Sequence, residues 1–278
     1  MTDAAVDWSA ITTVLCDLDG VIWLAHHPIP GSVEAVDALR RSGRRVLFVT
    51  NNSAATLAEH EAALAGVGIA ASGDVVSSSM AAAHLIEPGQ RVLVTGGAGV
   101  AEACALRGAE VVVNDGQVDP TGFDAVVVGL HRDFDYWRLA VATRAIRGGA
   151  RLIGTNTDST FPTPDGLLPG GGSILAAVAT ASGAEPTIGG KPHAPMATLI
   201  AEVVSTAAVP FAPGRTLMVG DRPETDGLFA ERLGSRFALV RTGVPSPTTA
   251  FDDVRVDLDA ADLREVAATL SSPPRVQR

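Results

Sequence analysis

Two aspartates follow the first buried run of the sequence and stand two positions apart. Val14-Leu15-Cys16 is typical of a strand, and Asp17-Leu18-Asp19-Gly20 comes directly after it. Residues i and i+2 of an extended chain face the same way, so both carboxylates are expected to project together from the carboxyl end of a strand. Adjacent carboxylates repel each other unless a proton or cation lies between them, and Mg²⁺ prefers such oxygen ligands. The pair predicts either a divalent-cation site or a solvated Asp-x-Asp turn.

Two further aspartates follow a later apolar run. Asp221 comes just after Leu217-Met218-Val219, and Asp226 lies five positions on, near the start of a helical stretch. Alone, Asp226 would be an ordinary acidic residue in the first turn of a helix. Together with the first pair, these residues predict several carboxylates at the strand ends of one sheet.

Groups suited to phosphate lie at two other places in the chain. Thr50 ends an apolar run and is followed by Asn51 and Asn52. A hydroxyl and nearby backbone N–H groups suit phosphate oxygens, although a capping or Asx turn explains the same residues. Lys191 lies in a Gly-Gly-Lys-Pro stretch. Its ammonium is suited to a carboxylate or a phosphate, and the alternative is an exposed loop lysine.

Short apolar runs alternate with helical patterns along the chain, which predicts an α/β fold with a doubly wound parallel sheet. The predicted strands of this sheet include residues 14–16, 46–49, 217–219 and 237–240. A helix is expected over 32–41 with Ser32 as its cap, and Thr56 with Glu59 forms a capping box for another.

A second domain is expected inside the first. Thr50 and Lys191 stand 141 positions apart, whereas a βα unit takes about 30 residues. The intervening chain has strand patterns of its own at 92–94, 111–113, 125–128 and 152–153, and a helix over 136–147 after Asp135. We therefore predict a discontinuous core of 1–86 and 184–270, an inserted α/β domain of 87–183, and a loose tail of 271–278.

Composition narrows the class of protein. The 278 residues are 46% hydrophobic and 19% charged, as in folded soluble chains, and the formal net charge is −10. Such a charge argues against nucleic acid or an anionic membrane as a partner, and no apolar run approaches the roughly 20 residues of a membrane span. The only two cysteines, Cys16 and Cys104, fit no disulfide framework, so we expect a cytoplasmic location.

The motifs together resemble the haloacid dehalogenase-like (HAD) hydrolase superfamily. Asp17-Leu18-Asp19-Gly20 looks like its first motif, Thr50 its second, Lys191 its third, and Asp221 with Asp226 its fourth. The residues next to Thr50, Lys191 and Asp221 resemble those of subfamily IIA, whose larger α/β cap is inserted between the second and third motifs. That branch includes p-nitrophenyl phosphatase-like enzymes and phosphatases of phosphoglycolate, glycerol phosphate and nucleoside monophosphates.

This resemblance implies a magnesium-dependent phosphatase with an aspartyl-phosphate intermediate. Asp17 would be the nucleophile and Asp19 the acid/base, with Lys191 as a further catalytic residue. Mg²⁺ would be held by Asp17, the backbone carbonyl of Asp19 and Asp221, while Asp226 would orient water or Lys191. Phosphate and substrate contacts would come from Thr50, Asn51, Asn52 and Lys191.

The substrate is expected to be a small phosphorylated metabolite: glycerol 3-phosphate, 2-phosphoglycolate, or a sugar or nucleoside monophosphate. The roles of the cap residues His131, Arg132, Asn156 and Asp158 stay open, and His131 stands where the resemblance suggests Asp. A homodimer through the cap is one expectation from similar enzymes. Two other functions remain as alternatives: a non-enzymatic nucleotide-binding or regulatory module, and a metal-independent dehalogenase.

Overall fold

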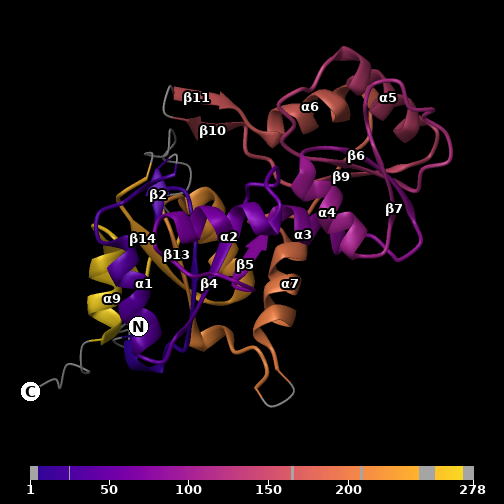
Figure 1. Cartoon of the computed structure of the whole chain (residues 1–278). Coiled ribbons are helices and arrows are strands. Elements are labelled where there is room, and N and C mark those ends of the chain that lie inside the picture. Colours follow the sequence, from indigo (N-terminus) through magenta and orange to yellow (C-terminus); the bar gives the residue numbers. More distant parts are fainter. Residues whose placement is uncertain (1–5, 25, 164–165, 207–208, 244–253, 272–278) are drawn as a thin grey trace, which may run out of the picture. The chain divides into compact units, whose positions relative to one another are not determined.

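The computed structural model describes residues 6–24, 26–163, 166–206, 209–243 and 254–271 of the chain (Figure 1). By internal contacts the chain divides into two compact units. Unit 1 comprises Met1–Val49, Glu61–Val75 and Ala201–Arg278, and unit 2 comprises Thr50–His60 and Val76–Ile200. Unit 2 includes more of the sequence than the inserted domain predicted at 87–183. The boundaries of that domain remain a prediction. Of the predicted tail, residues 272–278 lie outside the described residues.

Unit 1 is built on a six-stranded sheet with the order β15-β14-β13-β1-β4-β5. Its strands are β1 (Thr13–Cys16), β4 (Arg45–Thr50), β5 (Val75–Ser77), β13 (Thr216–Gly220), β14 (Arg236–Val240) and β15 (Leu258–Ala260). β1 runs parallel to both β13 and β4, with Cys16 opposite Val219 and Phe48. The predicted strands are therefore neighbours in one parallel sheet.

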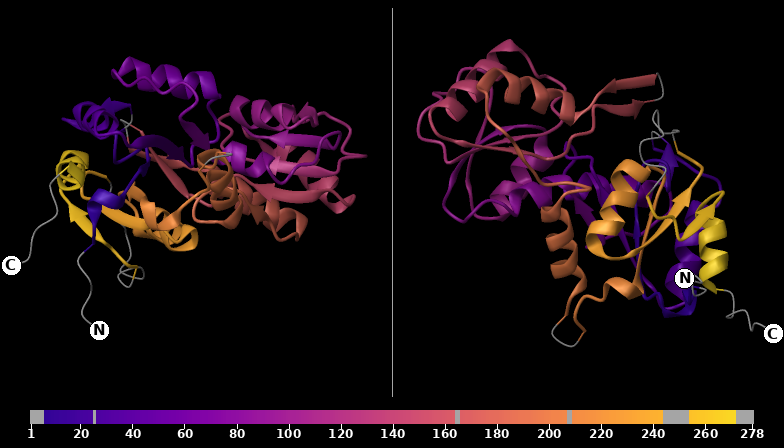
Figure 2. Two further views of the ribbon diagram at one scale, coloured as in Figure 1. Left: turned by 90° about the horizontal axis from the view of Figure 1, so that it is seen from below. Right: turned by 180° about the vertical axis from the view of Figure 1, so that it is seen from behind.

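The central strands β1 and β13 are buried along their whole length, as continuous apolar runs predict for a sheet that is covered on both faces. Helices α1 (Ser32–Arg41), α8 (Leu228–Leu233) and α9 (Leu263–Ser271) lie around it, with α1 packed against α9 (Figure 2). The predicted bounds of α1 are confirmed, but its N-cap residue is Gly31. Ser32 instead lies inside the first turn, where its hydroxyl donates to the carbonyl of Ile22 at 2.9 Å.

Unit 2 contains a five-stranded sheet with the order β12-β9-β8-β6-β7. Its strands are β6 (Arg91–Thr95), β7 (Glu110–Val113), β8 (Ala125–Val128), β9 (Arg151–Gly154) and β12 (Thr187–Ile188), and the paired strands run parallel. Four of these strands contain the apolar runs predicted for the inserted segment.

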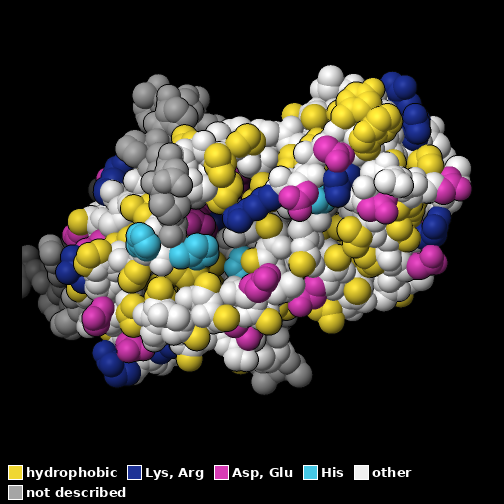
Figure 3. Space-filling model, turned by 45° about the horizontal axis from the view of Figure 1, so that its top comes forward, with side chains coloured by type: hydrophobic (Ala, Val, Ile, Leu, Met, Phe, Trp, Pro, Cys, Tyr) yellow, Lys and Arg dark blue, Asp and Glu magenta, His cyan; other side chains and the backbone are white. Residues whose placement is uncertain are grey.

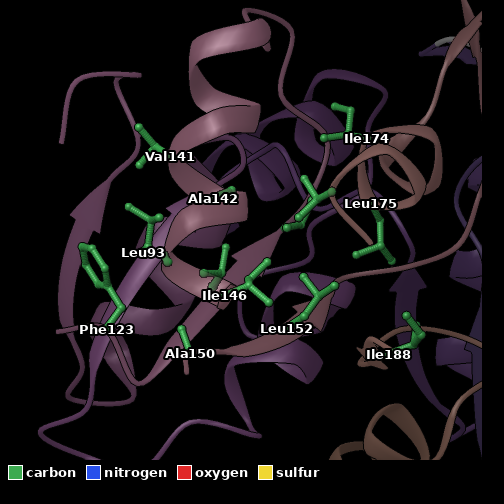
Figure 4. Packing of buried hydrophobic residues seen from close by; sticks show 14 of the residues in the cluster. Leu93, Phe123, Val141, Ala142, Ile146, Ala150, Leu152, Ile174, Leu175 and Ile188 are labelled. Atoms are coloured by element: carbon green, nitrogen blue, oxygen red, sulfur yellow. The ribbon is translucent and has the colours of Figure 1, made fainter. Parts of the chain in front are cut away.

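Alternate side chains of β8 enter two different cores. Val126 and Val128 pack with Val141 and Ile146 of α5 (Tyr136–Arg147) and with residues of α6 (Gly171–Ser182). Figure 4 shows the α5 residues of this core together with Ile174 and Leu175 of α6. Ala125 and Val127 pack on the other side, with residues of α3 (Ser78–Ala83) and α4 (Ala98–Leu106). Helices thus cover both faces of the second sheet, which explains its uninterrupted apolar strands.

Local signals fix several helix starts in unit 2. Asp135 caps α5 by accepting the N–H of Arg138 at 2.8 Å. The capping box before α2 (Leu57–Gly66) is confirmed, since Thr56 N–H donates to Glu59 at 2.8 Å and Glu59 N–H donates to Thr56 Oγ1 at 3.2 Å. The chain passes from β6 into α4 through the tight turn Gly96-Gly97.

Two short hairpins are absent from the predictions. β2 (Trp23–Leu24) pairs with β3 (His27–Pro28) in unit 1, and β10 (Thr160–Thr163) pairs with β11 (Gly166–Pro169) in unit 2. The remaining helix of more than one turn is α7 (Ala194–Val204). Among the helices of the described ranges, none combines the length and the apolar character that a bilayer crossing requires.

Candidate active site

Three aspartates of unit 1 form a compact carboxylate group. Asp17, Asp221 and Asp226 each offer an oxygen, and these oxygens lie within 4.8 Å of one another. Asp226 is fully buried, whereas Asp17 is half-buried. The first and fourth motifs, about 200 positions apart in the sequence, therefore meet at one place.

The parallel pairing of β1 with β13 brings Asp17 and Asp221 together. Asp17 follows the last residue of β1, and its N–H donates to the carbonyl of Val219 at 2.9 Å. One carboxylate oxygen of Asp17 accepts the N–H of Leu18 at 2.8 Å. Asp221 follows the last residue of β13, so both aspartates stand at the carboxyl ends of adjacent strands, where open α/β sheets bind ligands.

Asp226 reaches the group through a π-helical turn at Pro223–Gly227. Its carboxylate accepts the N–H of Arg222 at 3.3 Å, and its own N–H donates to the carbonyl of Arg222 at 2.8 Å. A Cβ on Gly220 would overlap the Asp226 carboxylate. The backbone at Gly220 therefore approaches this carboxylate more closely than any larger residue allows.

Two more glycines surround the Asp221 carboxylate. A Cβ built on Gly20 or on Gly243 would collide with it. Gly20 also has φ +87°, in the left-handed region that favours glycine, and its carbonyl accepts the Thr242 hydroxyl at 2.6 Å. The chain therefore turns sharply at Gly20, and the lack of a side chain there permits the close packing around Asp221.

Asp19 lies in the turn that follows β1. Because β1 ends at Cys16, strand alternation does not set the directions of Asp17 and Asp19 as the sequence suggested. A turn sets them instead, in which the Gly20 N–H donates to the carbonyl of Trp23 at 2.7 Å. Among the described residues, the compact carboxylate group contains Asp17 and leaves Asp19 outside it.

The donor chemistry of the group suits a hard divalent cation. Three carboxylates this close repel one another strongly unless positive charge lies among them. Mg²⁺ is commonly held by one or two carboxylates together with water and phosphate oxygen. The residues present therefore fit the predicted magnesium cofactor, and a solvated Asp-x-Asp turn does not account for Asp221 and Asp226.

By internal contacts Thr50, Asn51 and Asn52 belong to unit 2, which begins at Thr50, the buried last residue of β4. The Thr50 hydroxyl oxygen accepts the N–H of Asn52 at 3.0 Å, and Asn52 Oδ1 accepts the N–H of Ala54 at 3.1 Å. Local turns of the kind given as the alternative are therefore present at these two side chains, and the predicted phosphate contact stays a prediction. The Thr50 hydroxyl still has its proton to donate, so the turn leaves room for a phosphate contact.

Lys191 is also in unit 2 and is only 1% exposed, which rules out the alternative of an exposed loop lysine. Its main chain pairs with the side-chain amide of Asn51. Lys191 N–H donates to Asn51 Oδ1 at 2.9 Å, and Asn51 Nδ2 donates to the Lys191 carbonyl at 3.1 Å. The second and third motifs are thus joined by direct hydrogen bonds.

Of the cap residues whose roles the sequence left open, two contact Asn51 and two have other neighbours. Asn156 and Asp158 join Asn51, through Asn156 Nδ2 to the Asn51 carbonyl at 2.8 Å and Asn51 Nδ2 to Asp158 Oδ1 at 3.3 Å. Arg132 lies over the ring of Phe161, 5.8 Å from its centroid. Burial, followed by the nearby Arg138, lowers the pKa of His131.

Three buried hydroxyl-bearing residues of unit 2 were not anticipated. Ser53 Oγ accepts the Leu130 N–H at 3.2 Å and the Thr155 hydroxyl at 3.0 Å. Ser78 donates to the Asn51 carbonyl at 2.7 Å. Serine and threonine are too common in turns for the sequence to single these out.

A haloacid dehalogenase-like hydrolase model matches residues 14–110, and a HAD-hydrolase-like model matches residues 188–266. Chronophin from Mus musculus is 37% identical over 245 residues, covering 84% of this chain and 82% of chronophin. The chain belongs to the haloacid dehalogenase-like hydrolases. The two matched ranges contain all four motifs of this HAD chain.

Other relatives of this HAD chain carry phosphatase names. D-glycerol 3-phosphate phosphatase from Mycobacterium tuberculosis is 40% identical over 239 residues, which cover 84% of this chain but 64% of that protein. A crystal structure of glycerol phosphate phosphatase from the same organism, in complex with magnesium, superimposes with a TM-score of 0.82 at 34% identity. That match covers 97% of this chain and 82% of the crystallised one.

These relatives confirm the predicted family, the α/β fold class and the class of enzyme, a HAD-like phosphatase. They also agree with subfamily IIA. The magnesium in the crystallised relative and the carboxylate group of unit 1 both support the predicted cofactor.

Proposed function

We propose that this HAD protein is a magnesium-dependent phosphatase of small phosphate monoesters, working through an aspartyl-phosphate on Asp17. The observation that carries the proposal is the carboxylate group of Asp17, Asp221 and Asp226, whose oxygens lie within 4.8 Å of one another. A group of this kind suits a cation in a way that a simple binding module does not require.

In the proposed reaction, a carboxylate oxygen of Asp17 attacks phosphorus and the bond to the leaving alkoxide breaks. Asp19 protonates that alkoxide. Asp19 then takes a proton from the water that attacks the aspartyl-phosphate, so that inorganic phosphate leaves and the Asp17 carboxylate is restored. The hydrogen bond from Leu18 N–H to Asp17 supports the role of Asp17 as nucleophile, because it fixes the orientation of the Asp17 carboxylate.

A phosphate ester is anionic, and the chain carries a formal net charge of −10, so the site must supply positive charge of its own. On the face shown in Figure 3, acidic and basic side chains are interspersed, so no broad basic field there would draw in a phosphate. Asp17, Asp221 and the carbonyl of Asp19 are proposed to hold Mg²⁺, with Asp226 in support. When bound, Mg²⁺ would neutralise charge on the transferring phosphoryl group.

Thr50, the backbone N–H of Asn51, and Lys191 are proposed to hold the phosphoryl oxygens. Helix and loop N–H groups, a hydroxyl and a buried ammonium are suitable donors for a phosphate. The Asn52 side chain is proposed as a further donor through its Nδ2 group, since its Oδ1 accepts the Ala54 N–H.

The proposed substrates are glycerol 3-phosphate, 2-phosphoglycolate, and sugar or nucleoside monophosphates. Glycerol 3-phosphate has additional support from the mycobacterial relative, which is named a phosphatase of that ester. The cytoplasmic location stays a proposal, in keeping with two cysteines that are free and buried. A homodimer also stays a proposal.

The test is phosphate release from p-nitrophenyl phosphate and from these esters, with Mg²⁺ and with excess chelator. We expect activity only with the metal, and a loss of about 10³-fold or more in Asp17→Asn, as for removal of other enzymic nucleophiles. Full activity with chelator or in Asp17→Asn would refute the mechanism. Halide release without Mg²⁺ would identify a dehalogenase instead.

A further inference from the structure

We infer that the Asn51 side chain is a positioning residue that holds the main chain of Lys191, rather than a ligand of the phosphate. This inference rests on the proposed function for its catalytic consequence, but it concerns a contact the sequence motifs do not assign. All of the residues that carry it belong to unit 2.

The amide of Asn51 has already used its donors. One bond runs from Nδ2 to the Lys191 carbonyl at 3.1 Å, and a second runs from Nδ2 to Asp158 Oδ1 at 3.3 Å. A primary amide has two N–H groups, so both are engaged. Phosphate oxygens accept hydrogen bonds and do not donate them when ionised, so this side chain has nothing left to offer a phosphate.

The acceptor of the same amide closes a two-way bond. Asn51 Oδ1 accepts the Lys191 N–H at 2.9 Å, so that the N–H and C=O of Lys191 are both paired with one planar group. A single hydrogen bond would fix only one of the two peptide groups that flank Lys191. Two hydrogen bonds fix both, and with them the direction of the backbone at Lys191. The start of the lysine side chain is fixed with it.

Asn51 is itself held from two other elements. Its carbonyl accepts the Ser78 hydroxyl at 2.7 Å and Asn156 Nδ2 at 2.8 Å. Asn156 is 3% exposed, and its Oδ1 accepts the N–H of Asp158 at 3.0 Å. We call the two hydrogen bonds between the Asn51 amide and the Lys191 main chain the clamp. The surrounding network therefore fixes the clamp at several points, and it gives Asn156 and Asp158 a role that needs no contact with substrate.

Gly190 makes room for the clamp. A Cβ at this position would lie 2.6 Å from Asn51 Oδ1, 2.6 Å from the Thr155 carbonyl oxygen and 2.8 Å from Ser78 Cβ. Two of these neighbours are themselves parts of the network. An alanine at residue 190 should therefore disturb the clamp without altering the chemistry of Asn51.

The first test is independent of enzyme activity. Hydrogen exchange at the Lys191 amide should become roughly tenfold faster in Asn51→Ala, because its hydrogen bond is lost. Gly190→Ala should have a similar effect, and it serves as the second variant if Asn51→Ala fails to fold. The matched control is Asn114→Ala, because Asn114 is buried in unit 2 and donates to Thr95 Oγ1 and the Arg138 carbonyl instead.

The second test is a double-mutant cycle on kcat/KM for p-nitrophenyl phosphate. Asn51→Ala should lower kcat/KM by up to about 100-fold in the wild-type background, the scale of a catalytic group misplaced by about 1 Å. In a Lys191→Met background the same change should cost little, because no ammonium remains to be positioned. The control Asn114→Ala should leave kcat/KM near the wild-type value in both backgrounds.

An equal loss in both backgrounds, or unchanged exchange at Lys191 in Asn51→Ala and Gly190→Ala, would overturn the inference. The two proposals fail separately. If the wild-type protein releases no phosphate from any ester, the proposed function fails, and the exchange measurement alone decides whether the clamp exists.

Discussion

Gly20→Ala tests whether backbone proximity keeps the Asp221 carboxylate in place. Gly20 combines φ +87° with a Cβ position that overlaps this carboxylate. The substitution therefore adds two separate effects. One is strain in the backbone, and the other is displacement of a proposed metal ligand.

The strain has a known scale. An alanine in the left-handed region costs about 1–2 kcal/mol. Each kcal/mol lowers Tm by about 2–4 °C in proteins of about 150–250 residues, so the lower end of that range applies to this chain of 278 residues. The displacement follows from the geometry. The added Cβ would lie 2.4 Å from Asp221 Cγ, while ordinary van der Waals contact begins at 3.4 Å, so the carboxylate must retreat by about 1.0 Å. A shift of that size costs up to about 100-fold in rate.

Gly43→Ala separates the two effects. Gly43 has φ +82°, close to that of Gly20, but a Cβ there meets nothing within 4 Å. Both variants should lose similar stability in urea unfolding. Only Gly20→Ala should also lose phosphate release and the rise in Tm on adding Mg²⁺. The reasoning is refuted if Gly20→Ala keeps wild-type activity, or if Gly43→Ala loses activity to the same degree.

Three further predictions concern features outside the carboxylate group. Burial raises the pKa of Cys16 and of Cys104 from 9.0 to about 12, so iodoacetamide at pH 8 should label neither thiol in the native protein and both in urea, as counted by intact mass. Thr56→Ala removes half of the capping box with Glu59 and should lower the free energy of unfolding by about 1 kcal/mol, whereas Thr56→Ser should keep most of it. The pKa of His131 in the folded protein is below its usual 6.5, so its contribution to stability is present above pH 6.5 and is lost as the pH falls through that lower pKa. In His131→Asn the urea concentration at the unfolding midpoint should therefore depend less on pH between pH 7 and 5. An unchanged pH dependence would contradict this prediction.

Much of the fold could be predicted because its signals are local. Most strands of both sheets, such as β1 and β8, contain continuous apolar runs, and α5 has both its capping residue, Asp135, and its bounds in the sequence. The carboxylates were also predictable, since Asp17 and Asp221 directly follow such runs. Parallel neighbours in one sheet then place them together.

Other features depend on contacts that a linear reading does not contain. β2 and β3 have two residues each, too few for a periodic pattern. Ser78 and Asn156 contact Asn51 from 27 and 105 positions away, with no spacing rule to pair them. The misplaced cap at Ser32 has a similar cause, since the carbonyl of Ile22 takes its hydroxyl.

The order of β1 within its sheet has a consequence for biosynthesis. β1 lies between β4 and β13, and Thr13 pairs with Thr216, more than 200 positions away. A ribosome that has released residue 200 has supplied all of unit 2, but unit 1 still lacks β13, β14 and β15. During that interval one edge of the apolar strand β1 has no partner strand. We expect unit 2 to fold first, and chaperones that shield apolar strand edges to raise the yield of nascent chains.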